Sequence, residues 1–320
     1  RPRFGRTAAA AAAVVVFAAG ALGGRLLAGG PAPECFDGTL RLLGSTAFER
    51  TAEALRADYE ALCGAATVEV DATGSNEGVR ALTAKGAGST IAMHDGHLRP
   101  DSDEVGLRGF QGFPVSLLAY AVIVNKDTGV TDLPVQTLRA IYAGADGPAD
   151  WKRVRGGASL PIRLVSRTEG SGTRTIFEER VLQGAEPGLS SRDCLRKDDL
   201  RAAARIVRCE RSSQGQVLDL VDRTPGAIGY AELHLAADTA RYPGVRVIAL
   251  DGRRPGTAPG EYPFNAPEVF YTYGFPANGT PVSAFLTYLS GPRARALLTR
   301  VGSPPCLAPT PPLAALCRSR

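Results

Sequence analysis

The sequence predicts an α/β fold, and three observations support this prediction. Runs of apolar strand residues alternate with amphipathic helical patterns along most of the chain. With 320 residues, the chain is long enough for one large or two medium-sized domains. Several strands lead directly into short turns rich in Gly, Ser and Thr that open helices. In open α/β sheets, ligand sites lie at such turns.

The predicted strands are short runs of apolar and β-branched residues, at 39–43, 67–72, 118–125, 162–166, 227–230 and 245–250. The predicted helices have apolar positions three and four residues apart. They run from Phe48 to Leu62, through Val79 and Leu82, around 138–142, through Ile176, Phe177 and Val181, and over 282–289 and 294–301. The Pro-rich segment from Ser303 is expected to be extended.

The N-terminal segment, residues 1–30, indicates export. Thr7–Gly24 is an uncharged run of 18 residues preceded by three arginines. A basic flank before an apolar run is typical of a signal peptide or a single membrane anchor. Both alternatives stay open, because the run is only weakly apolar and Ala19–Ala21 resembles a cleavage site. In either case the body of the protein is expected outside the cell membrane, anchored or secreted.

The charge of the chain is concentrated at one end. The formal net charge is +5, but residues 1–30 hold four arginines and no acidic residue. The remainder has 33 basic against 32 acidic residues and is therefore nearly neutral. This balance argues against nucleic acid or an acidic membrane surface as the partner.

Six cysteines, all after the apolar run, predict disulfide bonds. An even number of cysteines in an exported chain favours pairing. We expect three local pairs: Cys35–Cys63, Cys194–Cys209 and Cys306–Cys317. The sequence has no Cys-x-x-Cys motif and no Cys/His cluster, so a zinc site is not expected. Free buried thiols remain the alternative for any one pair.

Three turns contain the residues that suggest a ligand-binding site. They are 43–48 (Leu-Gly-Ser-Thr-Ala-Phe), 72–78 (Ala-Thr-Gly-Ser-Asn-Glu-Gly) and 166–173 (Ser-Arg-Thr-Glu-Gly-Ser-Gly-Thr). A helix N-terminus presents unpaired N–H groups and a partial positive charge, and Ser and Thr add hydroxyl donors. Together, the three turns predict a site for one small oxyanion.

A single turn of this kind has a simpler interpretation, because Ser and Thr cap helices in many proteins. Arg167 favours the anion site, since a guanidinium group is a fork that suits phosphate oxygens. The alternative for Arg167 is a surface arginine paired with Glu169. Both interpretations hold if Glu169 orients Arg167.

These residues resemble the phosphate-binding proteins of the high-affinity phosphate ABC importer, in the type II periplasmic-binding-protein superfamily. The motif most specific to that family is Arg167-Thr168-Glu169-Gly170-Ser171-Gly172-Thr173. Other segments resemble family motifs in their order and spacing, and they lie at 44–46, 73–75, 94–96, 141–144 with Trp151, and 226–230. The resemblance covers roughly 39–306 and implies two α/β lobes that close on dehydrated phosphate.

The resemblance also implies the bounds of the lobes. Residues 36–117 and 261–305 would form the first lobe and 118–260 the second, with a two-segment hinge between them. Residues 306–320 would form a Pro-rich tail. A ligand that bridges the lobes would favour the closed state.

The phosphate ligands follow from the same resemblance. Those of the first lobe would be Ser45, Thr46, Ala47, Phe48 and Ser75, with Asp95 accepting a proton of the phosphate. Those of the second lobe would be Arg167, Ser171, Gly172 and Thr173. No metal and no cofactor are expected.

Three residues near these turns depart from the family pattern. Glu77 stands where the family prefers small residues, and an acid near an anion site is unfavourable unless it points away. His94 and His97 flank Asp95. We expect surface histidines there rather than a metal pair, because no third ligand is evident.

The predicted function is an exported, monomeric and non-enzymatic solute-binding protein that delivers inorganic phosphate to ABC permease subunits. One alternative is a membrane-tethered phosphate sensor. Another is a phosphatase or serine hydrolase that uses Ser45, Ser75 or Ser171. The second alternative is weaker, because the sequence has no Gly-x-Ser-x-Gly elbow and only three histidines.

Overall fold

The computed structural model describes residues 34–84, 87–99, 108–144, 147–198, 205–256, 261–306 and 317–318. The predicted export segment lies outside the described residues, as does most of the predicted tail. In the part of the chain that is described, no helix has the length and apolar character needed to cross a membrane.

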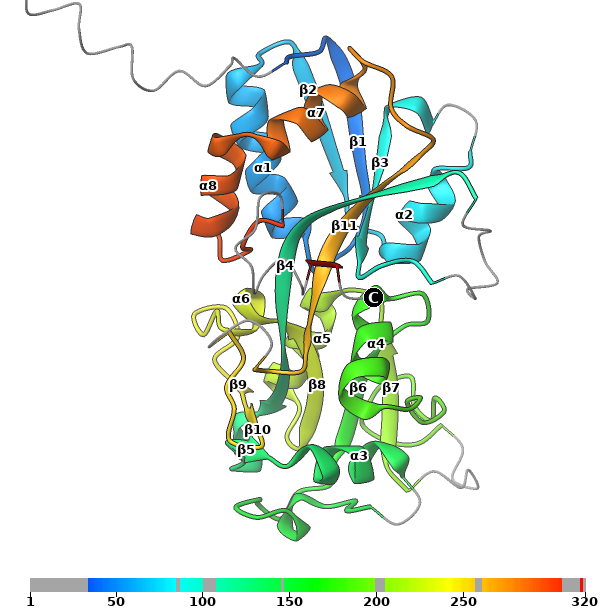
Figure 1. The fold of residues 1–320 in the computed structure, drawn as a ribbon. Coiled ribbons are helices and arrows are strands. Elements are labelled where there is room, and N and C mark those ends of the chain that lie inside the picture. Colours follow the sequence, from blue (N-terminus) through cyan, green and yellow to red (C-terminus); the bar gives the residue numbers. More distant parts are fainter. Residues whose placement is uncertain are drawn as a thin grey trace, which may run out of the picture. The chain divides into compact units, whose positions relative to one another are not determined.

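The described chain is a mixed α/β structure (Figure 1). Its strands are β1 Gly38–Gly44, β2 Ala66–Asp71, β3 Thr90–Asp95, β4 Phe110–Asn125, β5 Asp132–Leu133, β6 Arg163–Arg167, β7 Val207–Arg211, β8 Ala227–Glu232, β9 Val245–Val247, β10 Ala249–Leu250 and β11 Asn265–Tyr273. Its α-helices are α1 Glu49–Leu62, α2 Ser75–Ala81, α3 Val135–Ala143, α4 Gly172–Ile176, α5 Gln214–Arg223, α6 Leu233–Ala236, α7 Pro281–Ser290 and α8 Pro292–Arg300. Four short turns of other helix types are η1 Ala87–Ser89, η2 Lys126–Thr128, η3 Trp151–Arg153 and the π-helical η4 Phe177–Leu182.

The main sheet contains two groups of parallel strands. Its nine strands follow the order β2-β1-β3-β11-β4-β8-β6-β7, with β9 paired to β4. Strands β1, β2 and β3 are parallel to one another, and so are β6, β7 and β8. The antiparallel strands β11 and β4 join the two groups, and Figure 1 shows both strands running from one group of helices to the other.

Strand β4 belongs to both groups. Its first part, from Phe110 to Ala119, pairs with β11, and its last part, from Tyr120 to Val124, pairs with β8. The strand therefore changes partner close to residue 118, where the second lobe is predicted to begin. The lobe bounds themselves stay a prediction.

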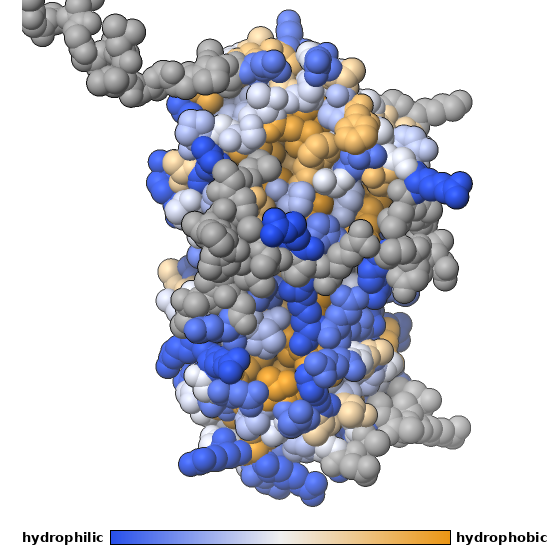
Figure 2. All heavy atoms as spheres, in the orientation of Figure 1, coloured by the Kyte–Doolittle hydropathy of each residue, from blue (hydrophilic) through white to orange (hydrophobic). Residues whose placement is uncertain are grey.

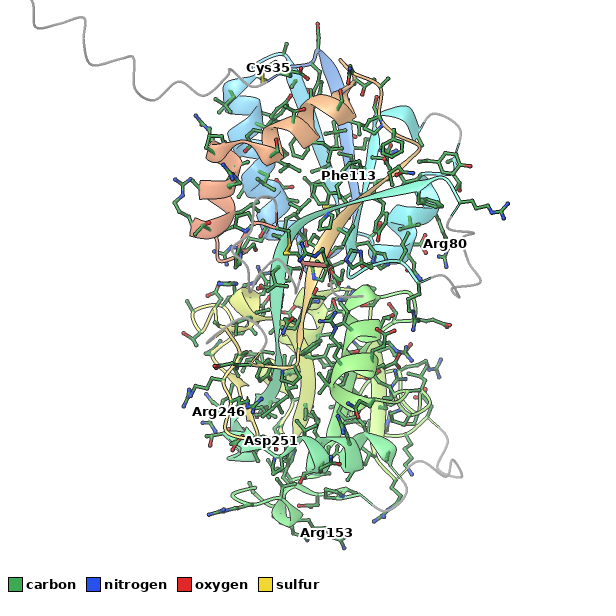
Figure 3. The ribbon with its side chains drawn as sticks, in the orientation of Figure 1. Cys35, Arg80, Phe113, Arg153, Arg246 and Asp251 are labelled. Atoms are coloured by element: carbon green, nitrogen blue, oxygen red, sulfur yellow. A yellow bond between two sulfur atoms is a disulfide. The ribbon has the colours of Figure 1, made fainter. Side chains whose placement is uncertain are left out.

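All three predicted disulfides are confirmed, and the described chain has no free cysteine. The bond Cys35–Cys63 joins the segment before β1 to the end of α1, and Figure 3 labels Cys35 at that end of the sheet. Beneath it, Tyr59 is fully buried and stacks on Phe36. The disulfide therefore closes one end of the apolar core.

Several elements differ from the prediction. Strands β3, β7 and β11 and helix α5 were not predicted, and the strand predicted at 118–125 begins at Phe110. Strand β11 contains Pro267 and Glu268, which interrupt an apolar strand pattern although both residues are buried. The strand predicted at 245–250 is two strands, because β9 pairs with β4 while β10 pairs with β5.

The surface is mixed rather than uniformly polar. Figure 2 shows hydrophilic side chains among smaller apolar areas on one face. The large apolar residues with the most exposure are Leu189, Leu195, Tyr273 and Phe275. Two of them lie at the end of β11, whereas the first eight residues of that strand are buried.

Candidate anion-binding site

The three predicted turns follow β1, β2 and β6, and they lead into α1, α2 and α4. The end of β1 requires glycine, because Gly44 has a φ of +132°. A Cβ atom at Gly44 would also lie 2.2 Å from the carbonyl oxygen of Met93. This close approach brings the first turn next to the end of β3, as the amide of Ser45 donates to the same carbonyl at 2.9 Å.

The third turn packs directly on the second turn and on the end of β3. A Cβ atom at Gly172 would lie 2.7 Å from the carbonyl oxygen of Asp95 and 2.8 Å from Oγ of Ser75. The amide of Asn76, in the second turn, donates to the carbonyl of Gly170 at 3.3 Å. Only glycine at position 172 therefore lets the N-terminus of α4 reach β3 and α2.

Asp95 lies where the two strand groups meet. Its Oδ1 accepts a hydrogen bond from the hydroxyl of Ser45 at 2.5 Å, and its Oδ2 accepts one from the hydroxyl of Thr173 at 2.6 Å. The amide of Gln214 donates to Oγ1 of Thr173 at 2.9 Å. Asp95 precedes a turn at Gly96, and its carboxylate joins the first turn to α4.

Arg167 is a buried cation rather than a surface arginine, with 2% of its area exposed. Its Nε and Nη2 donate to the carbonyls of Arg211 and Ser212 at 3.3 and 2.7 Å, so these carbonyls, not Glu169, orient it. Its Nη1 has no hydrogen-bond partner among the described residues. Burial lowers the pKa of Arg167, and the charge of Asp95 opposes that shift.

The first turn uses one hydroxyl in two ways. Oγ of Ser45 accepts hydrogen bonds from the amides of Ala47 and Phe48 at 3.2 and 3.1 Å, while its own proton goes to Asp95. The neighbouring Oγ1 of Thr46 is buried and makes no hydrogen bond within the described chain. The first turn therefore leaves Thr46 with an unused donor.

The serines of the other two turns also accept backbone hydrogen bonds. Oγ of Ser75 accepts from the amide of Asp95 at 3.4 Å. Oγ of Ser171 caps α4 by accepting from the amide of Arg174 at 3.4 Å. Helix capping and a place at the anion site are thus compatible, because each hydroxyl proton stays available to donate.

The structure brings all ten predicted ligand residues into one buried cluster. They are Ser45, Thr46, Ala47, Phe48, Ser75, Asp95, Arg167, Ser171, Gly172 and Thr173. Their role as phosphate ligands stays a prediction.

Three further residues of the cluster were not predicted: Gln214, Tyr120 and Glu268. Glu268 pairs directly with Asp95 across β11 and β3, and its side chain is fully buried. The hydroxyl of Tyr120 is buried without a hydrogen bond in the part of the chain described, and burial raises its pKa well above the usual value. Gln214 begins α5 and Glu268 lies in β11, two elements that were not predicted. Tyr120 lies in the predicted strand at 118–125, but no local motif marks it as a site residue.

The side chains that depart from the family pattern interact with groups other than the ten predicted ligands. The side chain of Glu77 is 58% exposed and forms an ion pair with Arg80, which Figure 3 draws beside α2. The expectation of a surface residue is wrong for His94, which is buried with Nδ1 3.0 Å from the carbonyl oxygen of Gly96. Nε2 of His97 lies 3.2 Å from the carbonyl oxygen of Cys317. The described residues contain no group of side chains suited to a metal ion.

A protein-family model described as a PBP superfamily domain matches residues 29–293. The chain belongs to the PBP superfamily. This PBP-superfamily chain is 29% identical over 256 residues to the phosphate-binding protein PstS of Bacillus subtilis (strain 168). That match covers 79% of this chain and 75% of the relative.

Solved structures show the same fold. An ABC-type phosphate transport receptor from Vibrio cholerae is 24% identical, with a TM-score of 0.59 over 84% of this chain and 100% of its own. A phosphate-binding protein from Stenotrophomonas maltophilia is 16% identical, with a TM-score of 0.60 over 84% of this chain and 90% of its own. The predicted fold class of this PBP-superfamily protein is therefore confirmed.

Proposed function

We propose that this protein captures inorganic phosphate outside the cell and passes it to an ABC importer. The main support for the proposal is Arg167, a buried guanidinium at the meeting point of the two strand groups, whose Nη1 has no hydrogen-bond partner among the described residues. A buried donor without a partner costs roughly 1–3 kcal/mol. An anionic ligand at Nη1 would remove that cost and neutralise the charge.

The neighbouring groups suit a tetrahedral oxyanion. The turn before α1 adds the hydroxyl of Thr46, which has no hydrogen bond within the described chain, and the N-terminus of α4 adds the hydroxyl proton of Ser171 and backbone amides. Asp95 is an acceptor when ionised, so it requires a ligand that still carries a proton. Phosphate near neutral pH meets this requirement, whereas sulfate carries no proton.

Binding explains the site better than hydrolysis does. In the described chain, each of the three histidines contacts a group other than a serine hydroxyl. His94 contacts the carbonyl of Gly96, and His97 contacts the carbonyl of Cys317. His234 contacts the carboxylate of Glu232. The serines donate to or accept from Asp95 and backbone groups. A hydrolase of the Ser-His-Asp type would need a histidine within hydrogen-bond reach of its serine hydroxyl. We therefore propose that the protein is not an enzyme.

Delivery to a permease is proposed from the relatives, since both the PstS of Bacillus subtilis and the receptor from Vibrio cholerae are named for phosphate binding or transport. The basic flank and the apolar run of Thr7–Gly24 support export of the protein, which we propose to be a monomer. A tethered phosphate sensor would use the same site. Genes for a permease and an ATPase beside this one would favour import over sensing.

Calorimetric titration of the purified protein with phosphate, sulfate and molybdate tests the proposal. We expect one phosphate to bind per chain, with little or no heat from the other two anions. Absence of phosphate binding would refute the proposed function. Turnover of a chromogenic phosphate ester that Ser171→Ala abolishes would instead establish a hydrolase.

A further inference from the structure

Glu268 is a second carboxyl group beside Asp95. The two residues are directly opposite each other in the antiparallel pair of β11 and β3, which places their Cβ atoms about 4.5–5.5 Å apart. On its other side, Glu268 is opposite Ser116 of β4, and the register of that pair shifts immediately after Glu268. Such irregularities often re-aim a side chain next to a functional site.

The two carboxyl groups have unequal surroundings. Asp95 accepts hydrogen bonds from the hydroxyls of Ser45 and Thr173. Glu268 is fully buried, and neither of its carboxyl oxygens has a hydrogen-bond partner among the described residues. An ionised carboxylate in such a position carries a large desolvation cost, so the proton of the pair belongs on Glu268.

The electrostatics of the surroundings agree with this assignment. Burial raises the pKa of Glu268 well above its usual value, and the negative charge of Asp95 raises it further. The other titratable groups near it are His94 on β3 and Tyr120 on β4. Burial lowers the pKa of His94, so it stays neutral at and above neutral pH and supplies no positive charge. Two cations interact with neighbours of Glu268: Arg167 on β6 with Asp95 and Tyr120, and Arg180 on η4 with Tyr120.

We propose that Glu268 is a proton-carrying residue of the anion site, so that the Asp95–Glu268 pair meets the ligand with one negative charge and one O–H donor. This inference rests on the proposed function, because the ligand is taken to be phosphate. The pair then offers an acceptor for the ligand's proton at Asp95 and a donor for a bare ligand oxygen at Glu268. The neutral carboxyl group also limits the repulsion that two carboxylates would exert on an anion.

The sign of the pH dependence follows directly. Below the pKa of Glu268, its carboxyl group carries the proton and the affinity for phosphate is at its highest. As the pH rises through that pKa, the pair gains a second negative charge and the affinity falls. Glutamine cannot ionise, so Glu268→Gln keeps a donor and an acceptor without this alkaline loss.

The test is calorimetry with inorganic phosphate from mildly acidic to alkaline pH, on wild type and Glu268→Gln. The ratio of the two affinities cancels the titration of phosphate itself. We expect the variant to bind within about threefold of wild type at neutral pH. Above the pKa of Glu268 the ratio should rise in favour of the variant, by up to about tenfold per pH unit.

Two matched variants distinguish proton donation by Glu268 from a purely structural contribution of its side chain. Glu268→Leu keeps the volume but lacks a donor, and should bind phosphate roughly tenfold to a hundredfold more weakly. Glu186→Gln changes another buried carboxyl group, one that is paired with Arg208, and should leave the pH profile of binding unchanged. A constant ratio across the pH range, or loss of binding in folded Glu268→Gln, would overturn the inference.

A second measurement covers the case in which Glu268→Gln does not fold. In wild type labelled with ¹³C at the glutamate carboxyl carbons, one carboxyl group should keep its proton at neutral pH and shift when phosphate is added. Absence of such a resonance would overturn the inference even if phosphate binds normally. Absence of phosphate binding to wild type would instead count against the proposed function.

Discussion

Two clusters of buried charge lie near the third turn, and they use their charges differently. In the first, side chains of opposite charge pair with one another. Arg208 contacts Glu186 at 2.7 Å and Glu210 at 2.8 Å, while Arg174 contacts Glu210 at 3.0 Å and Glu178 at 3.1 Å. Each charged group of this paired cluster therefore has a partner within the fold.

The second cluster is the candidate anion site, in which the charges are not paired in this way. Arg167 donates to carbonyl oxygens, Asp95 accepts from hydroxyls, and Glu268 has no hydrogen-bond partner among the described residues. The comparison indicates how the proposed binding site differs from a structural ion network of similar composition. Charges that neutralise one another stabilise the fold, whereas charges held by neutral groups remain available to a ligand.

The largest expected effect concerns selectivity and the carboxylate of Asp95. Wild type should reject sulfate by roughly 10⁴–10⁵-fold relative to phosphate, because sulfate places a bare oxygen against a buried acceptor. Asp95→Asn should reduce this discrimination, since an amide can donate to an unprotonated oxygen. Competition calorimetry measures both affinities. Full discrimination in the variant would mean that Asp95 has only structural roles.

A slightly smaller effect is expected for Arg167→Ala. Loss of one side of a buried charge-assisted contact costs about 2–5 kcal/mol, or roughly 30-fold to several thousand-fold in phosphate affinity. Arg80→Gln is the matched control, because Arg80 forms an exposed ion pair with Glu77 on α2. If Arg167→Ala bound phosphate as tightly as the control, Arg167 would not be a ligand.

A substitution in the paired cluster should lower the stability of the protein and leave its phosphate affinity unchanged. Glu186→Ala leaves Arg208 with one acidic partner instead of two, and Glu186 is itself fully buried at its side chain. We expect the free energy of unfolding to fall by about 3–5 kcal/mol. Phosphate affinity, measured where the variant is still folded, should stay close to that of wild type. A large loss of affinity with unchanged stability would show that the two clusters are not distinct.

The smallest effect is expected for Glu77→Gln. The ion pair of Glu77 with Arg80 is more than 40% exposed on both sides, and such pairs contribute about 0.2–1 kcal/mol. Chemical denaturation should detect little change in stability, and the phosphate affinity should change less than about twofold. A tenfold gain in affinity would indicate that the Glu77 carboxylate faces the ligand.

The sequence alone predicted the α/β class, the three disulfide pairs and the cluster of ten site residues. Local patterns were sufficient for the fold class, the disulfide pairs and the three turns, whereas the resemblance to the phosphate-binding family implied the ten ligand residues. Ser and Thr after a strand define where a helix begins, and the glycines at 44 and 172 mark close approaches of the backbone. These signals lie within a few residues of one another in the chain.

Only the tertiary structure decided which distant residues complete the site. Glu268 and Gln214 come from β11 and the start of α5, elements that the sequence pattern did not predict. Pro267 and Glu268 would break an apolar strand in isolation, but the sheet order places β11 between β3 and β4 and buries both residues. Burial and the neighbouring charge of Asp95 then raise the pKa of Glu268. Such properties depend on which strands are adjacent in space, because desolvation and Coulomb interactions act over distances of a few ångströms and not along the sequence.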